Sequence, residues 1–247
     1  MKELTRKDID KWEDFKKEKD LLNRFNGMAH PHLVTLLATY QLNKSYHFIF
    51  PLAMCCFDSY WEDHVHSPSM NEATVIWLAD QLRGLVGALD TIHNPRHLSE
   101  QKYGRHGDIK ADNILCYPTT KYDYPMLVIT DMGLSELNSN KSKSNIPGEK
   151  VPEVPGYRPP ECDVEGGLVS RAFDIWTLGC LFFDIVAWFI GGWNLREQLR
   201  DKRTSINILA GVIKDIFYDV WPSPDGNGFV QTIKPKVTEV GVPTLPR

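Results

Sequence analysis

His106-Gly107-Asp108-Ile109-Lys110-Ala111-Asp112-Asn113-Ile114-Leu115 places acidic, basic and amide side chains within ten residues. Asp131-Met132-Gly133 begins sixteen residues after Leu115 and shortly after the apolar run Leu127-Val128-Ile129. Phosphoryl transfer requires a carboxylate that orients the attacking hydroxyl, a cation beside the moving phosphate and oxygen ligands for Mg²⁺. Asp108 can supply the carboxylate and Lys110 the cation. Asn113 and Asp131 can ligate the metal, because Mg²⁺ takes few protein oxygens and keeps waters and phosphates as its other ligands.

The order and spacing of these motifs resemble the catalytic core of protein kinases, His-Arg-Asp…Asn followed by Asp-Phe-Gly. Gly107 stands in place of the Arg and Met132 in place of the Phe. Lys110, two residues after Asp108, is similar to the Ser/Thr-kinase form of the loop. For either motif alone, a turn rich in Gly, Asp and Asn is the competing interpretation. The two motifs in this order favour the kinase interpretation.

Two further segments extend the resemblance. Pro159-Pro160-Glu161 is similar to the Ala-Pro-Glu that closes the kinase activation segment, which would begin at Asp131. Asp174-Ile175-Trp176-Thr177-Leu178-Gly179-Cys180 is similar to the start of the central helix of the large lobe, where Asp174 would brace the loop around Asp108. The amino-acid sequences of these segments look most like those of Ser/Thr kinase domains of filamentous fungi.

The composition is that of a globular protein, with 247 residues, 42% hydrophobic and 24% charged. A net charge of −4 indicates no basic field for nucleic acid. The five cysteines form no C-x-x-C pair, and the charged first twenty residues lack the apolar core of a secretory signal. These features predict an intracellular protein with reduced thiols.

The N-terminal part is predicted to form a helix from Ile9 to Phe25, because Trp12, Phe15, Leu22 and Phe25 recur at roughly helical spacing. Met1-Lys2-Glu3-Leu4 resembles the end of the kinase strand motif Val-Ala-Ile-Lys. The resemblance implies that Lys2 contacts the α- and β-phosphates of ATP and that Glu18 holds Lys2. The competing interpretation is an ordinary terminal lysine and a charged helix face.

No G-x-G-x-x-G loop occurs in the sequence, and two strands that normally precede the lysine are absent from it. We therefore expect a fragment of a longer reading frame, truncated at both ends.

The nucleotide pocket is expected behind the predicted strand Tyr46-His47-Phe48-Ile49-Phe50, which Pro51 ends. The resemblance implies that Phe50 guards the back of the adenine pocket and that Pro51, Leu52 and Ala53 form the hinge. It also implies that Leu115 lines the nucleotide site.

The middle of the chain is predicted to form a helix from Asn71 or Thr74 to His93. Its expected core face consists of Val75, Leu78, Leu82, Leu85, Val86, Leu89 and Ile92.

A second helix, from Asp174 to about Gly191, is apolar on all sides, which is typical of a core helix or a membrane span. Asp184 near its middle would cost ~2.5–3.5 kcal/mol at a bilayer centre, so we expect a core helix and no membrane association.

We expect residues 134–160 to be a loop, and further helices between Leu195 and Tyr218. Glu161 is expected to be unpaired, since its usual arginine partner would lie in a missing part.

These inferences predict an α+β, bilobal kinase-like fold with a partial small-lobe sheet and a mainly helical large lobe. Residues 1–247 would form a single domain, with a partial N-lobe at 1–52 and an incomplete C-lobe at 53–247. The predicted function is ATP- and Mg²⁺-dependent phosphorylation of a serine or threonine in a protein substrate.

Two alternatives remain open from the sequence. One is a non-catalytic regulatory module, suggested by the absent Gly-rich loop, by Gly107 and by Gly156, which stands where a Thr is usual. The other is a small-molecule phosphotransferase of the aminoglycoside or choline kinase type, since those enzymes resemble this chain in His-Gly-Asp…Asn. Lys110, Pro159-Pro160-Glu161 and Asp174 to Gly179 argue against the second.

Overall fold

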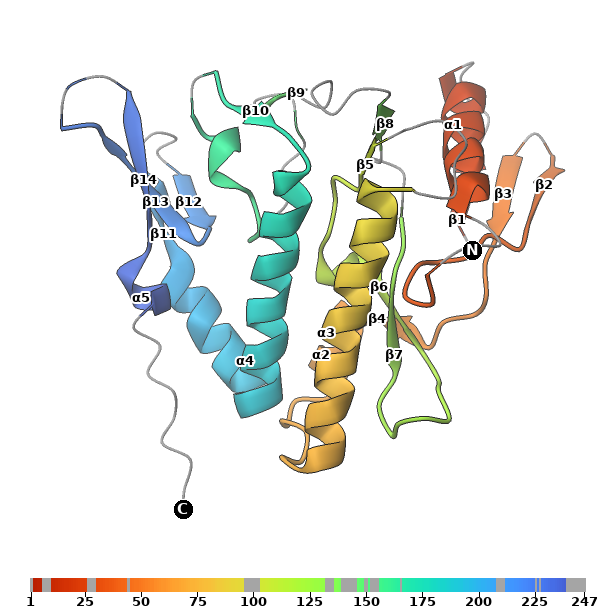
Figure 1. Cartoon of the computed structure of the whole chain (residues 1–247), viewed down its shortest axis with the longest axis horizontal. Coiled ribbons are helices and arrows are strands. Elements are labelled where there is room, and N and C mark those ends of the chain that lie inside the picture. Colours follow the sequence, from red (N-terminus) through yellow and green to blue (C-terminus); the bar gives the residue numbers. More distant parts are fainter. Residues whose placement is uncertain are drawn as a thin grey trace. The chain divides into compact units, whose positions relative to one another are not determined.

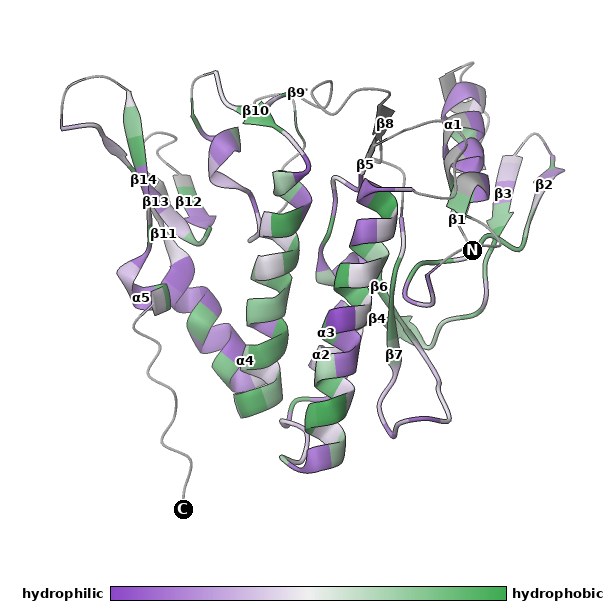
Figure 2. Cartoon of the chain, in the orientation of Figure 1, coloured by the Kyte–Doolittle hydropathy of each residue, from purple (hydrophilic) through white to green (hydrophobic). Residues whose placement is uncertain are grey.

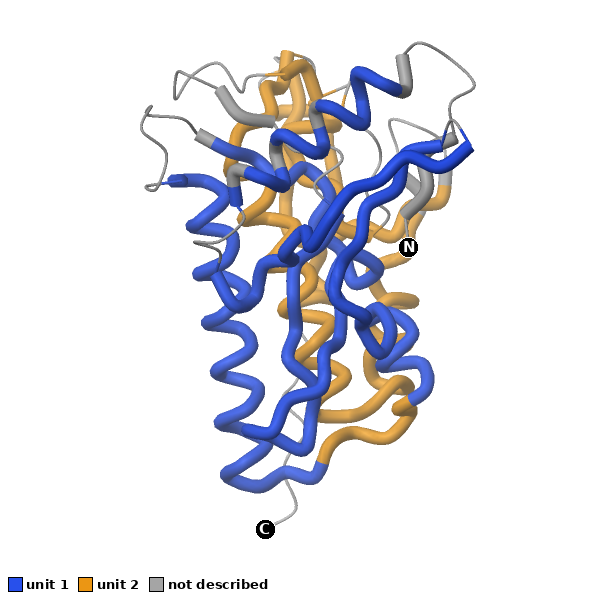
Figure 3. The backbone as a smooth tube through the Cα atoms, turned by 90° about the vertical axis from the view of Figure 1, so that its right-hand side faces the viewer, with its two compact units in different colours: residues 1–63, 69–144 blue, residues 64–68, 145–247 orange. Residues whose placement is uncertain are grey.

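The computed structural model describes residues 2–5, 10–25, 30–43, 45–95, 103–131, 136–138, 146–148, 151, 156–164, 166–207, 212–224, 226 and 228–238. These residues fall into two compact units, residues 1–63 with 69–144 and residues 64–68 with 145–247. Figure 3 shows the two units in different colours. The predicted lobe boundary at residue 52 does not coincide with this division and stays a prediction.

Unit 1 begins with a small antiparallel sheet whose strand order is β1-β3-β2. The strands are β1 (Lys2–Thr5), β2 (Ala38–Leu42) and β3 (Ser45–Ile49), and helix α1 (Asp10–Phe25) accompanies them (Figure 1). Phe15 of α1 packs against β3, with ring centroids 4.6 Å from Tyr46 and 4.8 Å from Phe48. Aromatic burial of this kind supplies the tertiary packing from which a helix in a protein gains most of its stability. The predicted helix and the predicted strand are both confirmed.

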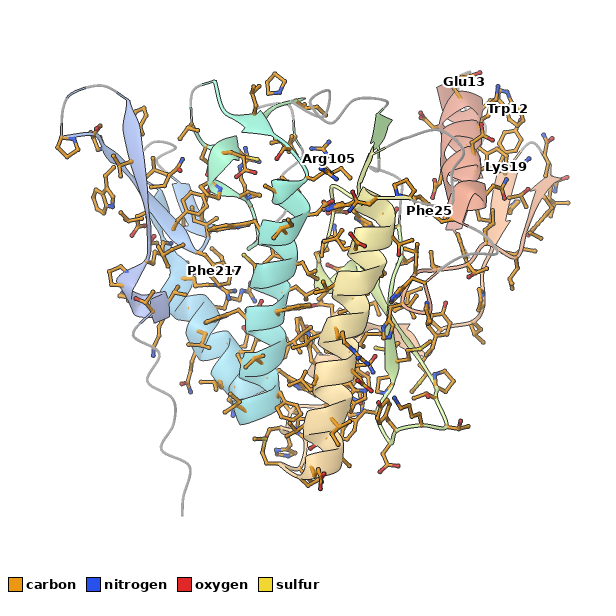
Figure 4. All side chains as sticks on the ribbon, viewed as in Figure 1. Trp12, Glu13, Lys19, Phe25, Arg105 and Phe217 are labelled. Carbon is orange, nitrogen blue, oxygen red and sulfur yellow. The ribbon has the colours of Figure 1, made fainter. Side chains whose placement is uncertain are left out.

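Trp12 departs from the predicted buried stripe, because 43% of its surface is exposed. Its ring nevertheless contacts Tyr46, with centroids 5.0 Å apart, and Figure 4 shows it on the strand side of α1.

The rest of unit 1 is built from helix α3 and a second three-stranded sheet of order β4-β6-β7. The elements are β4 (Cys55–Cys56), α2 (Phe57–Asp63), α3 (Glu72–His93), β5 (Tyr103–Arg105), the 3-10 helix η1 (Ala111–Asn113), β6 (Ile114–Tyr117), β7 (Met126–Ile129) and β8 (Glu136–Asn138). Asn71 caps α3: its side chain accepts a hydrogen bond from Thr74 N at 3.0 Å, and Thr74 Oγ1 accepts one from Asn71 N at 3.2 Å. This capping box confirms that the helix starts where the sequence predicted.

The buried face of α3 includes the predicted Leu85, Leu89 and Ile92 but is not limited to the predicted residues. Val75 and Val86 are about half exposed, whereas Trp77, Gln81, Gly84 and Ala88 are buried. Two polar anchors explain why Trp77 and Gln81 belong to this face. Trp77 Nε1 donates to the carbonyl of Pro125 at 2.9 Å, and Gln81 Oε1 accepts from Leu127 N at 3.0 Å. A prediction that counts only aliphatic residues finds part of this face and misses Trp77 and Gln81, because hydrogen-bonded polar groups share the face.

Unit 2 is organised around helix α4 (Ala172–Arg203), which turns sharply at Gly192 (Figure 1). Gly192 has φ of +67°, and a Cβ there would overlap the Val65 carbonyl oxygen, so only glycine fits without strain. Figure 2 shows that hydrophobic residues dominate the part of α4 before the turn.

Helix α4 is long and apolar enough to cross a membrane when judged by length and composition alone. In the structure 61% of its most apolar window is buried. Asp184 is 1% exposed, accepts a hydrogen bond from Tyr157 Oη at 2.8 Å and pairs with Arg203 Nη1 at 2.5 Å. This satisfied carboxylate supports the interpretation of α4 as a core helix.

The predicted helices after residue 195 are wrong beyond Arg203. Unit 2 contains β9 (Ile146–Pro147), the 3-10 helix η4 (Pro160–Cys162), β10 (Leu168–Val169), β11 (Thr204–Asn207), β12 (Val212–Asp215), β13 (Tyr218–Pro222), β14 (Phe229–Ile233) and the short helix α5 (Pro235–Thr238). The β-branched residues Thr204, Ile206, Val212 and Ile213 favour strands, and β11 and β12, which contain them, pair in antiparallel fashion. Strands β8 and β9 also interrupt the predicted loop at 134–160.

Candidate active site

The candidate site lies in unit 1 at one end of the hairpin formed by β6 and β7. Ile114 pairs with Ile129 at that end, and Thr130 N donates to the carbonyl of Asn113 at 2.9 Å. The hairpin therefore brings the end of the His106–Leu115 segment next to the start of the Asp131 motif. A further strand-like contact supports β7: Val34 N donates to the Ile129 carbonyl at 2.9 Å, and Ile129 N donates to the His32 carbonyl at 2.8 Å.

Asp108 is the centre of the site, because two predicted partners converge on one of its oxygens. Asn113 Nδ2 donates to Asp108 Oδ2 and to the Asp108 carbonyl, each at 2.8 Å. Lys110 Nζ lies 3.1 Å from the same Oδ2. The side chains of Lys110 and Asp108 are 30% and 15% exposed, so the pair is partly shielded from water while remaining accessible. The side chains of Lys110 and Asn113, both predicted to act in catalysis, thus each contact Asp108.

His106 is fully buried and links Asp108 to the end of β7. Its Nδ1 accepts a hydrogen bond from Asp108 N at 3.2 Å, and its Nε2 lies 2.9 Å from the Thr130 carbonyl. Since Nδ1 is the acceptor, the proton of a neutral imidazole belongs on Nε2, which donates to Thr130. This geometry fits the bracing role that the resemblance implies for His106. Gly107 between them has φ of +83°, a conformation that a β-carbon disfavours.

Asp131 follows Thr130 directly and adopts φ of +60°. Aspartate tolerates this left-handed conformation better than most residues, and non-glycine residues held in it are concentrated at functional sites. Met132 and Gly133 lie outside the residues that the structure describes.

The donor set suits Mg²⁺ better than a softer metal. Both hydrogen bonds to Asp108 use the amide nitrogen of Asn113, so the amide oxygen points away from Asp108 and can face a cation. One carboxylate and one amide, those of Asp131 and Asn113, suit an ion that keeps waters and phosphate oxygens as its other ligands. Within the described part of the chain, no group of three or more His, Cys, Asp or Glu side chains is placed to hold a metal.

The predicted lysine and glutamate are described only in part. The backbone of Lys2 pairs with Phe48 in the sheet, and its side chain lies outside the described part. Glu18 is 8% exposed and lies one turn after Phe15 on α1, on the face that packs against β3. The geometry therefore directs Glu18 toward the sheet that contains Lys2, and their ion pair stays a prediction.

The predicted hinge is attached to β6 on both sides. Tyr117 Oη donates to the Pro51 carbonyl at 3.0 Å, and Met54 N donates to the Cys116 carbonyl at 2.8 Å. Between these bonds Leu52 is 94% exposed and Ala53 is partly buried. Phe50 stacks on Phe48 with ring centroids 6.2 Å apart.

Leu115 is half-buried on β6, opposite Cys56. Sequence reasoning missed Tyr117. Its position two residues after Leu115 on a strand, which places both side chains on the same face, is the sequence feature that could have indicated a role near the site. Partial burial raises the pKa of the Tyr117 hydroxyl, which keeps it protonated as a donor to the hinge.

The segment that ends in Glu161 belongs to unit 2 and is held by its own contacts. Arg158 Nε pairs with Asp163 Oδ1 at 2.7 Å, while Tyr218 Oη donates to Asp163 Oδ2 at 2.8 Å. Glu161 forms no salt bridge with any residue that the structure describes, and burial raises the pKa of its carboxyl group. Strand β13, which carries Tyr218, thus anchors this segment.

Comparison with known proteins gives a consistent picture. The sequence model of the family described as "Protein kinase domain" matches residues 1–216. The chain is similar to serine/threonine-protein kinase SSN3 of Yarrowia lipolytica, with 34% identity over 133 residues, 50% of this chain and 31% of that protein. It is similar to serine/threonine-protein kinase chk-2 of Caenorhabditis elegans, with 31% identity over 117 residues, 47% of this chain and 22% of that protein.

A third similarity is longer and weaker. Cyclin-dependent kinase 14 of Callithrix jacchus is 25% identical over 202 residues, 79% of this chain and 41% of that protein. The chain spans less than half the length of each of these three relatives.

Proposed function

Since this chain belongs to the protein kinase domain family and its relatives are Ser/Thr kinases, we propose that it transfers the γ-phosphoryl group of ATP to a serine or threonine hydroxyl of a protein substrate. The observation that supports this most is the convergence of Lys110 and Asn113 on Asp108. The family match also favours a protein substrate over the small hydroxyl compounds of aminoglycoside or choline kinases.

In this mechanism Asp108 orients the attacking hydroxyl through its carboxylate. Lys110, whose ammonium group already lies beside that carboxylate, places positive charge next to the transferred phosphate. His106 keeps Asp108 in position through its backbone amide. Mg²⁺, held by Asn113 and Asp131, would neutralise charge on the phosphate oxygens.

The nucleotide would be positioned by groups at the other side of the site. Lys2 would contact the α- and β-phosphates, with Glu18 holding the lysine in place. The backbone groups of Leu52 and Ala53 would meet the adenine, with Phe50 behind it and Leu115 lining the site. The attachment of Pro51 and Met54 to β6 supports this assignment, because it presents the residues between them in a fixed position.

The test compares Asp108→Asn with Asp112→Asn, an exposed carboxylate in the same segment. Asp108→Asn keeps the side-chain shape and removes the charge, so we expect transfer to a Ser/Thr peptide library to fall at least ~100-fold. ATP and Mg²⁺ should still raise the melting temperature of this variant, and Asp112→Asn should behave like the wild type. Retained transfer in Asp108→Asn would remove Asp108 from its role. A wild-type chain that neither transfers phosphate nor responds to ATP would be a regulatory module instead.

A further inference from the structure

Strands β4 and β6 place two cysteines directly opposite each other. The antiparallel register pairs Cys55 with Cys116, while the next residue, Cys56, pairs with Leu115. Opposite residues of an antiparallel pair have Cα atoms ~4.5–5.5 Å apart, and a disulfide requires ~4.4–6.8 Å. Side chains alternate between the faces of a strand, so Cys56 points away from the face that Cys55 and Cys116 share. The fold has therefore assembled one dithiol from residues sixty-one positions apart.

The two thiols influence each other directly. Burial raises the pKa of Cys116, and the neighbouring Cys55 raises it further. Burial also raises the pKa of Cys55, which is partly exposed. Tyr60 of α2 belongs to the same cluster, because burial and then the charges of Cys116, Tyr124 and Cys55 raise the pKa of its hydroxyl. The thiol of Cys56 has a different neighbour, because its Sγ lies 3.4 Å from Ser59 Oγ.

We propose that Cys55 and Cys116 form a redox site that closes to an intramolecular disulfide when the protein meets a peroxide. The partly exposed Cys55 thiolate attacks one peroxide oxygen, the O–O bond breaks, and Cys55 becomes a sulfenic acid as the other oxygen leaves as water. The Cys116 sulfur then attacks the Cys55 sulfur, the S–O bond breaks, and a second water leaves with the Cys116 proton. Overall two thiols lose two electrons and two protons, and one hydrogen peroxide becomes two waters. A small-molecule thiol reverses the reaction by exchange.

The cross-link acts on the segment 50–54 that joins β3 to β4. Met54, the residue before Cys55, already donates its N–H to the Cys116 carbonyl at 2.8 Å. A disulfide between Cys55 and Cys116 would prevent β4 from separating from β6. It would therefore hold the end of this segment in place until the bond is reduced. We expect the oxidised protein to show slower amide exchange at residues 52–56 and a higher melting temperature, because the bond also constrains the unfolded chain.

The experiment treats the full folded chain with hydrogen peroxide and maps disulfides by mass spectrometry after alkylation of the remaining thiols. We expect a Cys55–Cys116 link in the wild type and in Cys56→Ser, and none in Cys55→Ser or Cys116→Ser. Cys56→Ser is the matched control, since it removes the adjacent thiol from the same strand and leaves the pair intact. The link and the slower exchange should both disappear on treatment with dithiothreitol.

The rate supplies a second measurement that does not depend on the variants. With both thiols largely protonated at neutral pH, the thiolate fraction rises about tenfold per pH unit, so cross-linking should be about tenfold faster at pH 8 than at pH 7. Three results would overturn the proposal: a link that involves Cys56, a sulfinic acid on Cys55 with Cys116 still reduced, or full retention of both thiols in the folded wild type at pH 8. Each readout is independent of kinase activity, so failure of the proposed function leaves this test unaffected.

Discussion

At the scale of single residues, the site depends on the orientation of one amide. Asn113 turns its nitrogen toward Asp108 and makes two hydrogen bonds of 2.8 Å, one to the side chain and one to the backbone. The same orientation leaves the amide oxygen for a cation. Asparagine therefore combines two functions that neither aspartate nor alanine could combine at this position.

Asn113→Asp should show this dependence. The introduced carboxylate would replace a donor with an acceptor beside the Asp108 carboxylate, and the folded chain should lose ~2–3 kcal/mol in unfolding free energy at pH 7. Like-charge repulsion raises the pKa of the new carboxyl group in the folded state, so the deficit should shrink as the pH falls through that raised value. Urea denaturation at pH 7 and pH 5 measures both effects. Asp112→Asn is the control, and equal deficits at the two pH values would contradict the argument.

At the scale of elements, the histidines of the segment His30–His32 pack directly against two glycines of α3, Gly84 and Gly87. A Cβ on Gly84 would overlap the His32 ring, and one on Gly87 would lie 2.6 Å from His30 Nε2. His32 is also fixed from the other side, because its Nδ1 lies 2.6 Å from the Leu127 carbonyl. The imidazole of His32 is thus confined between helix and strand.

Gly84→Ala should therefore destabilise the protein by ~1–3 kcal/mol, because the added methyl group displaces the His32 ring. Gly179→Ala in α4 is the matched control, since the position is exposed and a Cβ added there would meet no atom beyond the helix backbone within 4 Å. There alanine should stabilise the helix by ~0.5–1 kcal/mol. Thermal unfolding of the two variants measures the contrast. A stabilised Gly84→Ala variant would show that the His32 ring can move aside without cost in stability.

Helix α4 depends on a buried cation. Arg203 is 2% exposed and bonds to Asp184 at 2.5 Å and to Asp215 at 2.9 and 3.2 Å, with Phe217 stacked 4.4 Å from its guanidinium carbon. Phe217 is labelled beside α4 in Figure 4. Removing one partner of a buried pair leaves uncompensated charge.

Arg203→Met should accordingly lower the unfolding free energy by ~3–5 kcal/mol. Arg200→Met removes an arginine three residues earlier whose side chain is 52% exposed, and it should change the free energy by less than ~1 kcal/mol. Urea midpoints distinguish the two, and similar small effects would mean that Asp184 and Asp215 are stabilised without Arg203.

At the scale of the whole chain, the sequence predicted those features that depend on local pattern. The helices around Phe15 and Leu85, the strand around Phe48 and the family itself follow from short-range periodicity and motif spacing. Features that depend on distant partners were missed. The burial of Trp77 and Gln81 on α3 depends on Pro125 and Leu127, and the strands after Arg203 replace the helices expected between Leu195 and Tyr218. In the site, the contacts among Asp108, Lys110 and Asn113 follow from proximity in the sequence, whereas the Tyr117 contact with Pro51 spans 66 residues.

Buried titratable groups throughout the chain should produce a stability maximum between mildly acidic and mildly alkaline pH. On the acidic side, burial lowers the pKa of His30 and of His32 below the ordinary 6.5. The unfolded chain then binds protons first, so stability falls as the pH drops below that value. Glu161 acts in the opposite sense, because burial raises the pKa of its carboxyl group, and it makes this decline shallower.

On the alkaline side, burial raises the pKa of the thiols Cys116 and Cys180 above 9 and of the hydroxyls Tyr157 and Tyr218 above 10. Groups with a raised folded pKa stabilise the protein fully below their unfolded pKa, and this contribution is lost as the pH rises beyond it, since ionisation then favours the unfolded chain. The melting temperature under reducing conditions should therefore fall between pH 8.5 and pH 10.5. Cys180→Ala removes one such group and should make that fall shallower, while a constant melting temperature across the range would mean that these groups ionise without unfolding the protein.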